Sequence, residues 1–164
     1  MHYLDHACFS PPAADTIRAV RDAATALTQV GDAGATQLAL DWMQCRSRAR
    51  ESVATLLGCS VDDVTLVENT THGLGIVAGG LKLAAGDNVV VADCDFIGVP
   101  TVWRTHQRAG VELRAANSDH GRLSLDALLQ TVDERTRVIC ISAIQEVSGW
   151  PVDLDGAADI AESV

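Results

Sequence analysis

The sequence is poor in lysine. Of its twelve basic residues, eleven are arginine and one, Lys82, is lysine. The five cysteines are far apart and include no CxxC pair, so the sequence predicts neither a disulfide framework nor a zinc site. We expect them to be ordinary buried thiols in a reducing compartment.

A basic patch and a long apolar run are also missing. The net charge is −10, and the acidic residues are scattered along the chain, which argues against a nucleic-acid groove. No apolar run approaches the roughly 20 residues that cross a bilayer. The first residues, Met1 to Asp5, have neither the basic region nor the apolar core of a signal peptide. We expect a cytoplasmic protein that binds no nucleic acid and no membrane.

The remaining composition is that of a folded α/β domain. Hydrophobic residues make up 48% of the 164 residues, enough for one domain with a core. Helical spacing of apolar residues alternates with short β-branched runs, and uninterrupted apolar strands are typical of parallel sheets. We therefore expect a mainly parallel sheet flanked by helices. The predicted strands are 64–67, 88–92, 111–115 and 137–142, the last three adjacent, and the predicted helices are 17–27, 42–57, 71–83, 100–109, 125–132 and 154–164.

A glycine-rich segment, Gly73 to Ala78, matches the GxGxxA pattern of dinucleotide-binding proteins. Asp93 lies about 20 residues further on, where such a fold has its ribose-binding acid. That fold needs its first glycine directly after the strand, yet five polar residues, 68–72, separate Val67 from the first glycine. We therefore expect both glycines of the pattern to lie inside a helix, where glycine allows close packing on the sheet.

An anion site is predicted just upstream, at Thr70 and Thr71. These residues stand where a strand gives way to a helix, and the free N–H groups and positive dipole end of a helix N-terminus bind phosphate. Two hydroxyls would add neutral donors. The alternative is that one of the threonines only caps the helix, and spacing alone leaves both possibilities open.

Four segments together resemble the class V aminotransferase family, which includes the cysteine desulfurases. They stand in the family's order and cover nearly the whole chain. They are the arm Tyr3-Leu4-Asp5-His6-Ala7 with Pro11-Pro12, the phosphate turn Val67 to Leu74, the cofactor-stacking segment Gly86 through Phe96 to Trp103, and the strand Thr136 to Ser142 with Gln145 and Gly149. The resemblance implies part of the large domain of a fold type I pyridoxal-phosphate enzyme. An N-terminal arm and helix would span 1–30, and the N-terminal half of the cofactor-binding domain would span 31–164.

The resemblance assigns cofactor contacts to five residues. Thr70, Thr71 and the backbone of His72 would hold the phosphate of pyridoxal 5'-phosphate. Phe96 would lie against the pyridine ring, since an aromatic face can stack on it, and Gln145 would approach the ring oxygen. Both are similar to residues of isopenicillin-epimerase-like members, whereas desulfurases usually have histidine at the stacking position. Without the family, a core aromatic and a strand-end amide bonded to the backbone would explain them equally well.

Of three further positions, two differ from the residues that the family usually has. His6 would face the substrate, or lie at the surface or a dimer contact. His72 replaces the usual glutamate of the phosphate turn, and Glu146 stands where desulfurases have asparagine. Both departures put ordinary tight cofactor binding in question.

The resemblance also implies parts that this chain does not contain. In the family the pyridinium-pairing aspartate and the Schiff-base lysine come after the point matched by Val164, so no catalytic residue is assigned. Lys82 cannot substitute, because it stands at the far end of the helix that begins near Thr70, roughly 15 Å away. Strand 64–67 would pair with a strand of the second half and would have no neighbour here.

Three hypotheses follow for the function. The first is the N-terminal half or subunit of a class V enzyme that acts on an amino acid by aminotransferase, epimerase or lyase chemistry, as a homodimer or paired with a C-terminal-half chain. The second is a non-catalytic remnant that binds a partner or a phosphorylated ligand. The third is a small dinucleotide-binding domain. Half of a class V enzyme, inactive as this chain alone, is the interpretation that the four motifs favour.

Overall fold

A computed structural model describes residues 2–3, 6, 9–31 and 34–164. The chain divides into two compact units, Met1–Leu66 and Val67–Val164, which we describe separately. The predicted domain division between residues 30 and 31 falls within the first unit and stays a prediction. Among the described residues, no helix is long and apolar enough to cross a membrane.

The first unit consists of two long helices and one short turn. Helix α1 (Ala14–Thr28) begins just after the two prolines, which cannot continue a helix interior. Helix α2 (Ala35–Leu57) ends at Gly58, whose φ of 69° is left-handed and therefore suits glycine. Both helices and the glycine cap were predicted from the sequence. The apolar stripe of α1 contains no buried residue.

The segment after α2 is fixed by its own polar contacts. A 3₁₀ turn, η1 (Val61–Asp63), begins with a capping box between Ser60 and Asp63. The Arg50 guanidinium then donates to the carbonyl oxygens of Val64 at 2.8 Å and of Val61 at 2.5 Å. Arginine thus takes the place of a neighbouring strand in satisfying one backbone carbonyl of this segment.

The predicted strand 64–67 is wrong. These residues form no β-ladder within the described part of the chain. A strand requires pairing of its backbone groups with another strand, so the favourable local composition was not enough. The expectation that this segment would have no neighbour here agrees with the three strands of the sheet.

The second unit is built on a parallel sheet of three strands. Strands β1 (Asn88–Ala92), β2 (Glu112–Ala116) and β3 (Thr136–Cys140) have the order β2-β1-β3, and both pairs are parallel. The three strands were predicted within a residue or two at each end, and their adjacency is confirmed. All five residues of β1 are buried, as a strand between two neighbours requires when helices cover both faces.

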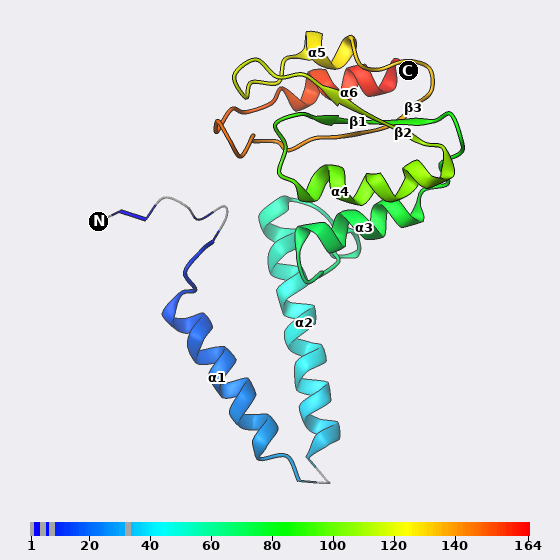
Figure 1. Ribbon diagram of the computed structural model, residues 1–164. Helices are drawn as coiled ribbons and strands as arrows, with labels where there is room; N and C mark the ends of the chain where they lie inside the picture. The colour runs from blue at the N-terminus through cyan, green and yellow to red at the C-terminus, as the bar shows by residue number, and fades with distance from the viewer. Residues whose placement is uncertain (1, 4–5, 7–8, 32–33) are drawn as a thin grey trace. The chain divides into compact units, whose positions relative to one another are not determined.

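Helices α3 (Thr70–Gly80) and α4 (Gly98–Arg104), with the 3₁₀ extension η2 (Thr105–Ala109), cover one face of the sheet (Figure 1). Trp103 is the largest fully buried side chain, and it packs with Val89 and Val91 of the central strand. The Nε2 atom of His106 lies 3.1 Å from the carbonyl oxygen of Ala78, which links η2 to the last turn of α3.

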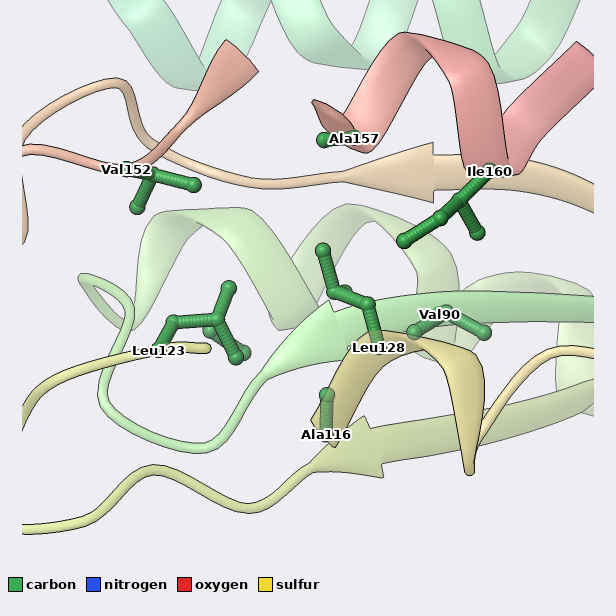
Figure 2. Packing of buried hydrophobic residues seen from close by; sticks show 8 residues of the cluster. Val90, Ala116, Leu123, Leu128, Val152, Ala157 and Ile160 are labelled. Carbon is green, nitrogen blue, oxygen red and sulfur yellow. The ribbon is translucent and has the colours of Figure 1, made fainter. Parts of the chain in front are cut away.

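Helices α5 (Leu125–Leu129) and α6 (Leu154–Glu162) cover the opposite face. Figure 2 shows Leu128 of α5 and Ile160 of α6 directed toward Val90 of the central strand. Ser124 caps α5 by accepting from the Ala127 N–H at 3.2 Å, as predicted. Alternate residues of β1 therefore contact two different cores, and the carboxyl ends of the three strands meet at one edge between them.

Candidate functional site

The N-terminus of α3 is capped by Asn69. Its Oδ1 atom accepts from the backbone N–H of His72 at 2.8 Å. The alternative prediction, that Thr70 or Thr71 caps the helix, is therefore wrong, because the cap is one residue earlier. Asparagine is among the best N-cap residues, so the signal was present in the sequence but was passed over for the two threonines that follow it.

Thr70 and Thr71 are the first two residues of α3. The first N–H groups of a helix have no acceptor within it, and the helix dipole makes this end attractive to anions. Both threonines are exposed. The His72 amide is already bonded to Asn69, and the His72 ring lies 3.3 Å from Glu68. The donors at this end are therefore two amides and two hydroxyls, with a third amide available only if the cap opens.

Thr71 and Phe96 meet at Gly98. A Cβ atom built on Gly98 would lie 2.7 Å from the Thr71 hydroxyl oxygen and 3.2 Å from the nearest carbon of the Phe96 ring. Because glycine has no Cβ atom, both groups can lie this close to the first turn of α4. Phe96 is half exposed, at 50%, so it is not the core aromatic that the alternative interpretation required.

The turn after β1 carries two aspartates, each bonded to a neighbouring strand's loop. Asp93 Oδ1 accepts from the Ser118 N–H at 3.0 Å, beyond the end of β2. Asp95 Oδ1 accepts from the Ser142 N–H at 3.2 Å, beyond the end of β3. The central strand's turn is thereby fastened on both sides, and Phe96 follows directly from it. Neither bond was predicted from the sequence, although an aspartate just after a parallel strand indicates a polar side chain at the carboxyl edge of the sheet.

Gln145 is fully buried, and its side chain is bonded at both ends. Its Oε1 atom is 3.2 Å from the Cys94 sulfur, and its Nε2 atom donates to the Ser142 carbonyl at 3.3 Å. Cys94 packs against the core on the α5–α6 face, whereas Thr71 and Phe96 lie beside α4 on the other face. The hydrogen bonds of the Gln145 side chain go to Cys94 and Ser142, and its contact with a ring oxygen stays a prediction.

Cys140 lies at the end of β3 on the α3–α4 face. Burial raises the pKa of its thiol above the ordinary value of 9.0, the Trp103 N–H lowers it, and the charge of Asp95 raises it. Among the described residues, the Trp103 Nε1 atom and the Asp95 Oδ2 atom are buried without a hydrogen-bond partner.

Three other positions were singled out from the sequence. His6 belongs to the first unit, where its Nδ1 atom is 3.1 Å from the Ser10 hydroxyl and its ring meets Tyr3 edge-on. Glu146 is exposed. Lys82 lies two residues beyond Gly80, the last residue of α3, at the opposite end of the helix from Thr70. The substrate role suggested for His6 stays a prediction.

The dinucleotide-binding alternative is not supported by this geometry. Gly73 lies inside α3 rather than at the tip of a strand, and Asp93 is bonded to Ser118. The prediction that both glycines of the GxGxxA pattern pack closely on the sheet is also wrong. Beyond α3's own backbone and the chain neighbours, a Cβ on Gly73 would meet, among the described atoms, the Val67 side chain at 3.4 Å, and one on Gly75 would meet none within 4 Å.

Comparisons with known proteins identify relatives over nearly all of the chain. A protein of Methanothermobacter thermautotrophicus named "Probable cysteine desulfurase" is 29% identical over 163 residues, which is 99% of this chain and 41% of the relative. A cysteine desulfurase of Klebsiella pneumoniae is 34% identical over 107 residues, 61% of this chain and 26% of its own. The chain thus spans less than half the length of these relatives.

Solved structures have the same fold. A mutant of C-DES with glycine covalently linked to its pyridoxal-phosphate cofactor matches with a TM-score of 0.83 and 17% identity, over 94% of this chain and 41% of that one. The cysteine desulfurase CsdA of Escherichia coli matches with a TM-score of 0.75 and 22% identity, over 98% of this chain and 42% of that one. These likenesses confirm the predicted fold, a mainly parallel sheet flanked by helices that forms part of a larger pyridoxal-phosphate enzyme fold.

The family itself follows from the sequence profile rather than from any one relative. The profile of the family described as aminotransferase class-V matches residues 2–164. The resemblance drawn from the four motifs is thereby confirmed, and the chain belongs to the aminotransferase class-V family.

Proposed function

We propose that this chain is the N-terminal half or subunit of a pyridoxal-phosphate enzyme that acts on an amino acid. It contributes contacts to the cofactor's phosphate and ring but not the Schiff-base lysine. The observation that carries the proposal is the meeting of Thr71 and Phe96 at Gly98. An anion-binding helix end and an exposed aromatic face stand side by side there, as a planar ligand with a phosphate group requires.

The donors available suit the cofactor. The amides and hydroxyls of Thr70 and Thr71 can donate to phosphate oxygens, and the dipole of α3 favours the negative charge. The Phe96 ring, being half exposed, can stack on the pyridine ring but cannot exchange a proton with it. The cofactor, when bound, supplies an electron sink for bond changes at an amino acid.

Reaction type and partner are part of the same proposal. Phe96 and Gln145 favour aminotransferase, epimerase or lyase chemistry over desulfuration, because desulfurases usually carry histidine where Phe96 stands. We further propose a cytoplasmic protein that works as a homodimer or with a chain carrying the second half of the family's fold. Since the sole lysine lies at the far end of α3, the chain by itself would be inactive.

A second candidate function follows from the position of Lys82 beyond the far end of α3. A chain that holds phosphate and ring without an amine at the reacting carbon would serve as a non-catalytic binding module. The two candidates differ in whether a lysine-bearing second half restores activity when it is mixed with this chain. A coding sequence for such a half beside this one would favour the split enzyme.

The test is a titration of the purified chain with pyridoxal 5'-phosphate, followed by absorbance and calorimetry. The double variant Thr70→Ala/Thr71→Ala should bind about tenfold to thirtyfold more weakly, since neutral hydrogen bonds contribute about 1 kcal/mol each. The matched control is Thr25→Ala/Thr28→Ala, which removes two exposed hydroxyls from α1 and should leave binding unchanged. Failure of the wild-type chain to bind the cofactor would contradict the proposal, and equal binding by the double variant would remove the threonines from it.

A further inference from the structure

The turn between β1 and α4, which carries Phe96, is fixed by hydrogen bonds on both sides of this residue. Asp95 comes directly before Phe96, and its Oδ1 atom accepts from the Ser142 N–H at 3.2 Å. The Phe96 carbonyl accepts from the Val99 N–H at 2.8 Å, at the first turn of α4. The backbone on both sides of the ring is therefore fixed, on one side by a bond to the loop after β3 and on the other by the start of a helix.

The second oxygen of Asp95, Oδ2, is buried and has no hydrogen-bond partner among the described residues. The Asp95 side chain is therefore held through Oδ1, by the Ser142 N–H. The loop after β3 is thus the part of the described chain to which this side chain is tied.

We propose that Asp95 is a positioning residue, which holds the Phe96 ring at the angle needed to stack on a planar phosphorylated ligand. It does so by tying the turn that follows β1 to the loop after β3, through the hydrogen bond that its Oδ1 atom accepts from the Ser142 N–H. This inference rests on the proposed function, because the ligand it serves is the cofactor. Asp95 itself makes no contact with that ligand.

The tie requires a strong acceptor, because the Ser142 N–H is a donor. Hydrogen bonds to a carboxylate are roughly twice as strong as bonds between neutral groups. Asp95→Asn can keep the bond only in its weaker, neutral form, and Asp95→Ala removes it. Both variants therefore loosen the turn that carries Phe96, the alanine variant more than the asparagine variant.

The experiment compares two ligands, pyridoxal 5'-phosphate and inorganic phosphate. Phosphate alone engages the N-terminus of α3 and not the ring. Asp95→Asn and Asp95→Ala should weaken cofactor binding by about threefold to tenfold, the effect of one hydrogen bond, and leave phosphate binding unchanged. In a Phe96→Ala background the Asp95 substitutions should have no further effect, because the ring that they position is gone. Asp119→Asn, whose carboxylate is 91% exposed, is the matched control.

Two outcomes would overturn the inference about Asp95 alone. Equal losses for both ligands would mean that Asp95 only maintains the fold, and unchanged cofactor binding would remove it from the site; either result overturns the inference while the proposed function stands. Absence of cofactor binding by the wild-type chain would overturn both. If Asp95→Ala does not fold, Asp95→Asn, which keeps the shape of the side chain, still gives the comparison.

Discussion

The Thr136 hydroxyl donates to the Asn88 Oδ1 atom at 2.8 Å, which joins the first residues of two neighbouring parallel strands that are 48 positions apart. The Asn88 Nδ2 group in turn donates to Asp133 at 2.8 Å, and the Asp133 N–H donates to the Thr136 hydroxyl at 2.9 Å. Asn88 is completely buried. A closed ring of polar contacts thus fixes the start of β3 against the start of β1, at the edge of the sheet opposite the candidate site.

Replacing Asn88 with alanine should lower the free energy of unfolding by about 2 kcal/mol, because buried Thr136 and partly buried Asp133 would each lose a bond. Urea unfolding followed by circular dichroism measures this loss. Asn117→Ala, at an exposed position after β2, is the control and should change stability by less than about 0.5 kcal/mol. Equal stability of the Asn88 variant and the wild type would contradict the role assigned to this ring.

Acid should weaken the same edge of the sheet through Arg114. Its guanidinium contacts Asp133 at 2.7 Å and Glu112 at 2.8 Å, and these hydrogen bonds hold both carboxyl pKa values below the ordinary 3.8 and 4.5. Because the pKa values are lower in the folded chain, their contribution is full above about pH 4.5 and is lost as the pH falls through the folded values. Arg114→Gln should flatten the loss of stability below that pH, whereas exposed Arg104→Gln should not.

Much of the fold was predictable because its signals are local. Runs of β-branched residues predicted β1 and β3, the alternation of strands and helices predicted β2, and Gly58 and Ser124 marked helix ends. Segment 64–67 has the composition of a strand, but pairing depends on a neighbour that no local window contains, and none was expected within this chain. The burial of Gln145 beside Cys94 depends on a loop geometry that spacing does not reveal, and its contact with a ring oxygen stays a prediction. Asn69 was missed although its capping signal was local.

The Cys140 thiol should react slowly with thiol reagents. Burial raises its pKa, so little reactive thiolate is present near neutral pH. Exposed Cys45 and Cys59 should be modified first by iodoacetamide at pH 8, as peptide mapping by mass spectrometry would reveal. The raised pKa also means that this thiol's contribution to stability is present below its ordinary value of 9.0 and is lost as the pH rises above it. Modification of Cys140 at the rate of Cys45 would contradict the burial described here.

Gly98 and Gly79 should respond in opposite directions to alanine. At Gly98 the new methyl group would meet the Thr71 hydroxyl and the Phe96 ring, so Gly98→Ala should cost about 1–2 kcal/mol of stability and weaken cofactor binding. At Gly79, inside α3, a new methyl group would meet no described atom within 4 Å outside its chain neighbours and the backbone of the helix itself, so Gly79→Ala should stabilise the chain by about 0.5–1 kcal/mol. Thermal unfolding and cofactor titration of both variants measure this contrast. If both variants lost stability, crowding of the new methyl group would not explain the loss in Gly98→Ala.

Lys82 should not become the covalent anchor of the cofactor. It lies two residues beyond Gly80, the last residue of α3, whereas the predicted anion-binding end begins at Thr70, and an 11-residue helix is about 16 Å long. A phosphate held at one end therefore leaves the aldehyde carbon far from the amine at the other, and chemistry with this cofactor begins from a lysine adduct. Borohydride reduction of the chain with bound cofactor, followed by peptide mapping, should give no stoichiometric pyridoxyl group on Lys82, and Lys82→Arg should bind the cofactor as the wild type does. Mixing with a lysine-bearing second half should restore covalent attachment and activity together. A stoichiometric adduct on Lys82, with turnover of an amino acid by this chain alone, would contradict the half-enzyme proposal.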